Sequence, residues 1–98
     1  MTFEPIIWCH VKASNPHNQT AEYYVAIGKE NWDEDGNNLV IKIQMEYERK
    51  RAGRKAPSFP VETDDFDKVS KAVSFLIKAY NNDHMNGDIT TQLNKNFF

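Results

Sequence analysis

The chain has 98 residues, of which 40% are hydrophobic, and its formal net charge at pH 7 is -2. This length and apolar content indicate one folded domain with a core and argue against a disordered chain. The charge excludes a generally basic protein, so affinity for a nucleic acid would need a local patch of cations.

Residues 1–98 are therefore expected to form a single domain, with a body over residues 3–82. The tail, residues 83–98, is polar except for a few apolar side chains, and it is either flexible or docked on the body or on a second subunit. Cys9 is the one cysteine, which excludes an internal disulfide and favours a reducing, cytoplasmic compartment. No apolar run is long enough to span a membrane, and no signal-peptide pattern is present, so no membrane association is expected.

Residues 3–13 and 21–29 alternate in the way that predicts two strands, with the polar stretch between them as a loop. Trp8 and Tyr24 are expected on the outer face of these strands. Trp8 either offers a platform on which a ring can stack or simply covers the far side of the sheet.

Residues 39–47 predict a third strand with one buried and one wet face. The residues expected inside are Leu39, Ile41, Ile43, Met45 and Tyr47. Residues 57–61 are expected to form a short fourth strand at an edge, because Pro57 and Pro60 cannot donate to a central ladder.

A cluster of cations lies between these two strands and holds five of the chain's twelve Lys and Arg residues. Its members are Arg49, Lys50, Arg51, Arg54 and Lys55. Gly53 allows a positive φ, so the cluster is predicted to sit on a hairpin loop. Such a cluster is either an ordinary solvated turn, neutralised by nearby carboxylates, or a binding site for a polyanion.

A helix is predicted from Asp65 to Tyr80, with Asp64 as its N-cap and several carboxylates near its positive end. Its expected buried stripe is Phe66, Val69, Val73, Leu76 and Tyr80. The predicted fold is therefore α+β, a curved four-stranded antiparallel sheet followed by one long amphipathic helix in the order ββββα.

The sequence contains no pattern of residues that indicates catalysis or metal binding. His10, His17 and His84 are scattered, which gives neither zinc-ligand spacing nor a catalytic triad. The acidic turn at residues 33–38 has its glycine in the wrong place for a calcium loop. No buried polar group with a shifted pKa is expected. The protein is thus predicted to be no enzyme and to use no cofactor or metal.

The order of elements and a short run of residues resemble the positive cofactor family of transcriptional coactivators. The similarity covers residues 39–73 and rests on Glu46-Tyr47, Gly53-Arg54-Lys55, the apolar residues 58–61 and an acidic helix start leading to Phe66. The resemblance implies a curved sheet and helix that dimerise and bind single-stranded DNA. Trp8, Tyr24 and the cations from Arg49 to Lys55 would then form the DNA surface, with bases stacked on the aromatic rings.

Two functions follow as hypotheses. The first is a non-enzymatic module that binds a single-stranded nucleic acid through the basic hairpin. The second is a protein-interaction or inhibitor module, of the phage or mobile-element type, that acts through the acidic segments 30–35 and 62–67. A homodimer is also expected, because Ile6, Trp8, Tyr24 and the terminal Phe97-Phe98 would leave apolar surface exposed.

Overall fold

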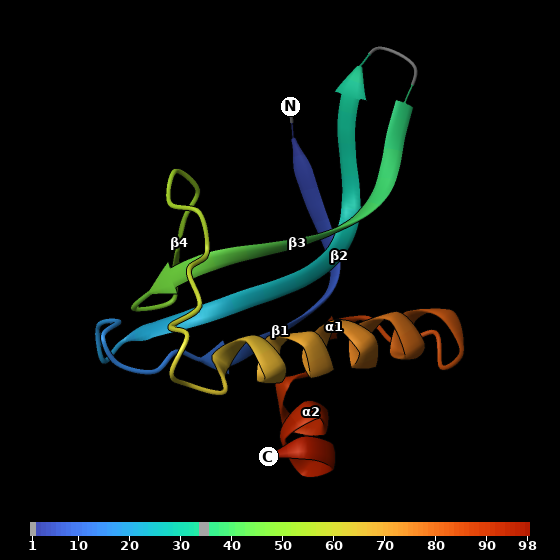
Figure 1. Cartoon of the computed structure of the whole chain (residues 1–98). Coiled ribbons are helices and arrows are strands. Elements are labelled where there is room, and N and C mark those ends of the chain that lie inside the picture. Colours follow the sequence, from blue (N-terminus) through green and yellow to red (C-terminus); the bar gives the residue numbers. More distant parts are fainter. Residues whose placement is uncertain (1, 34–35) are drawn as a thin grey trace.

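The sheet has five strands, and two helices pack on it (Figure 1). The computed structural model describes residues 2–33 and 36–98. The elements are β1 (Phe3–Lys12), β2 (Ala21–Asp33), β3 (Gly36–Tyr47), β4 (Lys50–Ala52), α1 (Asp65–Asn81), β5 (Gly87–Asp88) and α2 (Thr90–Phe97). The strand order is β4-β3-β2-β1-β5, with β5 parallel to β1 and the other neighbours antiparallel. The α+β class is confirmed. The prediction of four antiparallel strands with one helix is wrong in detail, because the C-terminal residues add a parallel strand and a second helix.

The sheet bends sharply about halfway along β2 and β3, as Figure 1 shows. Near this bend, Gly28 lies opposite Pro5 of β1, next to a register shift between Pro5 and Ile7. A Cβ added at Gly28 would come within 2.3 Å of the Glu4 carbonyl oxygen, so this close approach requires glycine. Irregular pairing of this kind bends a strand. Beyond the bend, β2 and β3 continue as a projection, which we call the arm (residues 28–33 and 36–40), and the start of β1 pairs with residues 28–30 at its base.

The β3–β4 turn differs from the predicted hairpin. Tyr47 pairs with Lys50, so only Glu48 and Arg49 form the turn, with φ values of 54° and 66°. Two positive φ angles in a two-residue loop are the signature of a type I′ turn. Gly53 was expected to supply the positive φ, and that is wrong. The basic residues Lys50 and Arg51 are part of β4 itself, because the chain reverses before the glycine is reached.

The predicted edge strand at residues 57–61 is also wrong. These residues form no strand, and Lys50–Ala52 is the edge strand instead. Pro57 and Pro60 lack the donors that a ladder needs, which agrees with the irregular path. The segment is held by side chains: the Phe59 ring stacks on Tyr23 with 4.9 Å between centroids.

Helix α1 confirms the predicted helix to within one residue, but its buried face is rotated from the prediction. The residues buried along it are Asp65, Val69, Ala72, Leu76 and Ala79. Phe66, expected in the stripe, is 63% exposed and touches Phe59 edge-on. Ala72 and Ala79 lie on the buried face instead.

The start of α1 uses its aspartates differently from the prediction. Asp64 is the N-cap residue, but its side chain makes no capping hydrogen bond and lies 3.6 Å from Lys68 Nζ. Asp65 points inward with no exposed surface, and it accepts hydrogen bonds from Ser14 N, Ser14 Oγ and Tyr23 Oη at 2.9, 2.6 and 2.7 Å. Burial alone raises the pKa of Asp65, but these hydrogen bonds outweigh it and hold the pKa below its ordinary value. The expectation that no buried polar group has a shifted pKa is therefore wrong.

The inner face of β3 is buried only at its C-terminal end. Met45 is 1% exposed, whereas Leu39 and Ile41 are 53% and 38% exposed. The strand itself is as predicted. The burial of Leu39 and Ile41 is wrong, because α1 packs on β1 and β2 and the bend carries the start of β3 away from it.

The C-terminal residues dock on the body, which is one of the two alternatives for the tail. Ile89 and Leu93 are almost fully buried in the core cluster, and Ile89 N donates to the Trp8 carbonyl at 2.8 Å. No helix among the described residues is long and apolar enough to cross a membrane. Of the residues expected to form a dimer surface, Tyr24 is only 3% exposed, so it cannot contribute apolar surface. The homodimer stays a prediction.

Candidate nucleic-acid interface

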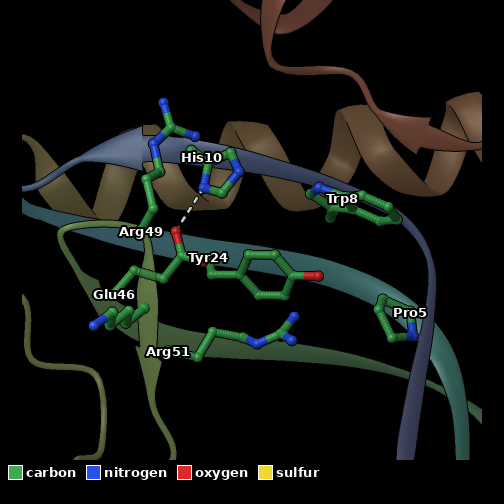
Figure 2. A pocket seen from close by; sticks show the side chains of 8 residues that line it. Pro5, Trp8, His10, Tyr24, Glu46, Arg49 and Arg51 are labelled. Atoms are coloured by element: carbon green, nitrogen blue, oxygen red, sulfur yellow. Dashed lines mark hydrogen bonds and ion pairs between the residues drawn. The ribbon is translucent and has the colours of Figure 1, made fainter.

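The face of the sheet opposite α1 is concave and holds a groove of about 700 Å³ (Figures 1 and 2). Its lining residues come from β1, β2, β3 and the β3–β4 hairpin: Pro5, Trp8, His10, Tyr24, Glu46, Arg49, Lys50 and Arg51. The bend produces the concavity, and the tight β3–β4 turn brings the cations to it. We call this site the groove.

An aromatic and cationic stack lies along the groove. The Arg51 guanidinium lies 4.8 Å from the centroid of the Tyr24 ring, and Trp8 lies 6.5 Å from the same ring (Figure 2). Tyr24 is thereby covered, and its burial raises the pKa of its phenol despite the opposing effect of Arg51. Trp8 is only half-buried. Trp8 and Arg51, rather than Tyr24, thus offer flat surfaces to a ligand.

Arg49 is held at the end of the groove by both backbone and side chain. Its φ of 66° lies in the left-handed region, which costs a residue with a Cβ roughly 1 kcal/mol or more. Its Nε lies 3.2 Å from Glu22 Oε1 on the neighbouring strand β2. The turn therefore places Arg49 against a carboxylate, whereas its neighbours on β4 pair with no carboxylate among the described side chains.

The five clustered cations fall into two groups, three that line the groove, among them Arg49, and two that do not. Lys50 and Arg51 line the groove, and no carboxylate among the described residues lies within ion-pair distance of either. Arg54 and Lys55 do not line it. Lys55 Nζ lies 5.0 Å from the centroid of the Tyr47 ring. The Tyr47 side chain packs against the core, on the face of β3 opposite the groove. Of the seven residues predicted to bind nucleic acid, five line the groove: Trp8, Tyr24, Arg49, Lys50 and Arg51.

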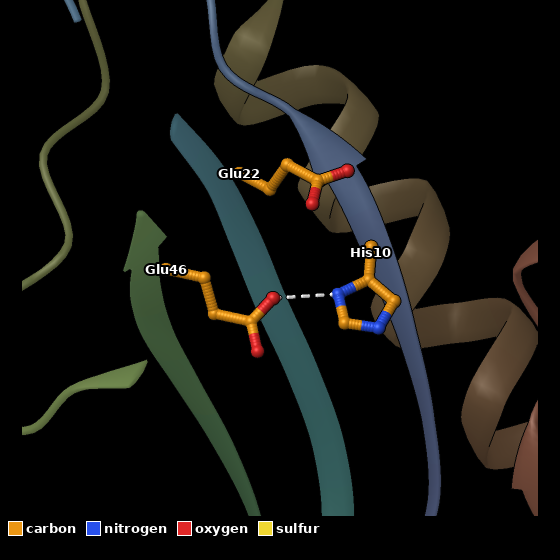
Figure 3. A group of neighbouring side chains, drawn as sticks. All are labelled: His10, Glu22 and Glu46. Carbon is orange, nitrogen blue, oxygen red and sulfur yellow. Dashed lines mark hydrogen bonds and ion pairs between the residues drawn. The ribbon is translucent and has the colours of Figure 1, made fainter. Parts of the chain in front are cut away.

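Behind the cations, His10 contacts two carboxylates. His10 Nδ1 is 2.7 Å from Glu46 Oε1 (Figure 3), and His10 Nε2 is 3.5 Å from Asp88 Oδ2. Asp88 accepts hydrogen bonds from Thr90 N and Thr90 Oγ1. Burial raises the pKa of Asp88, but these bonds and the neighbouring His10 leave it below its ordinary value. The docked C-terminal segment thereby fixes the His10 ring at the wall of the groove.

His10, Glu22 and Glu46 also bring one possible metal-ligand atom each to within 4.8 Å of one another (Figure 3). Glu22 and Glu46 pair directly across β2 and β3, and two like charges in this position repel. Imidazole and carboxylate groups suit divalent transition metals. In this structure, however, Arg49 pairs with Glu22 and His10 Nδ1 lies at hydrogen-bonding distance from Glu46, so protein groups already contact both carboxylates.

Sequence reasoning missed His10 and Glu46 as parts of the site. The two residues are 36 positions apart, and each occupies the wetter face of a predicted strand. Alternation does place both on the same side of a sheet. Only the register, in which His10 lies opposite Tyr24 and Tyr24 opposite Gln44, brings them into contact.

Comparisons with protein families, with curated proteins and with solved structures give no match to this chain. The resemblance to the positive cofactor family therefore stays a prediction.

Proposed function

We propose that the protein binds a single-stranded nucleic acid in the groove. The observation that carries this proposal is the Arg51–Tyr24 stack beside Trp8, together with two cations, Lys50 and Arg51, that pair with no carboxylate among the described residues. Sites for single strands combine exactly these two components, a cationic path for the phosphates and flat side chains for the bases.

The groove assigns different tasks to its residues. A base stacks on the half-buried face of Trp8, and the phosphates lie against Lys50 and the outer side of Arg51. Tyr24 supports the Arg51 guanidinium from below. Glu22 and Glu46 lie nearby, but Arg49 pairs with Glu22, so this carboxylate repels a phosphate less than a free carboxylate does.

The alternative function, binding of a basic partner through acidic surfaces, has less support. In segment 62–67, Asp65 is buried, and Asp64 and Asp67 each have a lysine four residues on as a partner. In segment 30–35, Glu30 pairs with Lys42. The side chains of residues 33–35 lie outside the described part of the chain.

Titration of a fluorescent dT12 oligonucleotide at several salt concentrations tests the proposal. The Lys50→Ala/Arg51→Ala variant should bind at least tenfold more weakly, and its plot of log affinity against log salt should be less steep by about 1.4, since each cation on a single strand contributes about 0.7. The matched control is Arg54→Ala/Lys55→Ala, which loses the same charge outside the groove. It should keep most of the affinity.

Equal losses in the two variants would mean that only general charge matters and that the groove is not the site. If the parent protein fails to bind dT12 even at low salt, the proposal is wrong and a protein partner becomes the better hypothesis.

A further inference from the structure

Trp32 is a second exposed aromatic residue on the concave side of the sheet. Its side chain is 58% exposed and lies near the end of β2, in the arm. Its Nε1 donates to Glu30 Oε1 at 2.6 Å, which places it on the same face of β2 as Glu30. A single exposed aromatic ring is common on a protein surface, so the position of Trp32 relative to the groove is what matters here.

This face of β2 is continuous with the groove. Alternation from Tyr24 leads through Ala26 and Gly28 to Glu30, and β2 pairs with β3 without a break up to Asn31. Trp32 lies at a register shift between Asn31 and Asp33, and its hydrogen bond to Glu30 places its ring on this face. Ala26 and Gly28 are small and buried, between Trp8 and Pro5 on β1 and Lys42 and Val40 on β3, so a ligand on this face would lie over those neighbouring side chains. Figure 1 shows that the bend turns the arm upward on the side away from α1, so its inner face looks toward the groove.

The side chains beside this path are of the same kinds as those in the groove, namely a cation and an aromatic ring. Lys42, opposite Ala26, lies 5.2 Å from the Phe3 ring and also pairs with Glu30. Glu30 accepts from Trp32 on its other oxygen. Glu30, the carboxylate that Trp32 contacts among the described side chains, is therefore paired with a lysine.

We propose that Trp32 is a second base-stacking platform, so that the ligand is a single strand long enough to reach from Trp8 to the arm. This inference rests on the proposed function. Trp8 lies opposite Ala26, and six residues lead from Ala26 to Trp32, about 20 Å along an extended strand at roughly 3.3 Å per residue. A trinucleotide stacked at about 3.4 Å per nucleotide covers only about 10 Å, so it fills one platform and not both.

Two single-tryptophan variants make the two platforms separately visible, because Trp8 and Trp32 are the only tryptophans in the chain. Trp32→Phe leaves Trp8 as the reporter, and Trp8→Phe leaves Trp32. We expect dT12 to quench the fluorescence of both variants. We expect dT3 to quench the Trp8 reporter and to leave the Trp32 reporter nearly unchanged.

Affinity supplies the second measurement. Trp32→Ala should weaken dT12 binding about tenfold, within the range seen when one stacking ring is removed, and should leave dT3 binding unchanged. The matched control is Phe98→Ala, which removes another exposed aromatic ring away from the concave face and should alter neither affinity.

The outcomes separate this inference from the proposed function. If dT12 quenches the Trp8 reporter but not the Trp32 reporter, and Trp32→Ala binds normally, the arm plays no part while the groove remains the site. If dT12 binds neither variant nor the parent, the proposed function fails and the inference fails with it.

Discussion

Two neighbouring residues on β1 show how differently the two faces of this sheet are used. Cys9 faces α1, has no exposed surface, and its burial, with the charge of Asp88, raises the pKa of its thiol to about 12. His10 faces the concave side and contacts Glu46 and Asp88. One face is thus closed by packing. The other carries charge and aromatic rings at a surface that a ligand can reach, and the difference indicates where stability and where binding reside.

The closed face is not purely apolar, since Asp65 lies within it. This carboxylate ties the start of α1 to Ser14 after β1 and to Tyr23 of β2. The concave face instead places its buried polar atoms next to the groove. The following substitutions test this difference between the face that packs on α1 and the concave face, from the largest expected effect to the smallest.

Asp65→Ala should lower the free energy of unfolding by about 3–4 kcal/mol, because it leaves buried donors on Ser14 and Tyr23 without their acceptor. Denaturant unfolding measures this. Asp65→Asn keeps the shape of the side chain and part of its hydrogen bonding, so it should lower the free energy of unfolding by less than Asp65→Ala does.

The dependence of stability on pH gives a second test of the role of Asp65. Its pKa in the folded chain lies below the ordinary 3.8, so its contribution to stability is present above about pH 3.8 and is lost as the pH falls through the folded value. Asp65→Ala should therefore lose less stability than the parent between pH 4 and pH 2, values chosen to bracket roughly the ordinary aspartate pKa. A parallel loss in both proteins would mean that Asp65 does not act as an anchored carboxylate.

Leu76→Ala should cost about 3 kcal/mol, since it leaves a cavity at a fully buried position of α1. Val73→Ala, one turn earlier at the half-buried flank of the helix, should cost only about 1 kcal/mol. Thermal and denaturant unfolding of the two variants tests which face of α1 is buried. Equal losses would contradict the face assigned to the helix.

Arg51→Ala should cost only about 0.5–1 kcal/mol, the value of a cation placed over an aromatic ring at a partly exposed site. The same change should weaken oligonucleotide binding far more than it weakens folding. A loss of stability as large as that of Leu76→Ala would show that Arg51 holds the sheet together and would remove the contrast between the two faces.

Much of the secondary structure follows from local patterns. Alternation predicted β1, β2 and β3, although β2 extends to Asp33 rather than ending at 29. Helical spacing predicted α1, but the predicted buried face was wrong. Phe66 was assigned to that face because it is large and apolar, whereas the small Ala72 and Ala79 were not assigned to it. The β3–β4 turn could not be predicted from residue types, since Glu48 and Arg49 both adopt φ values that favour glycine.

The sequence by itself determined the α+β class, the helix and the cations between residues 49 and 55. These depend on periodicity and charge within short segments. The tertiary structure decided which cations belong to the site. The tight turn places Lys50 and Arg51 in the groove and leaves Arg54 and Lys55 outside it. It also decided that Asp65 is buried, that the C-terminal residues fix His10, and that Trp32 shares a face with Tyr24. Each of these depends on strand register or on contacts between distant segments, which no local pattern encodes.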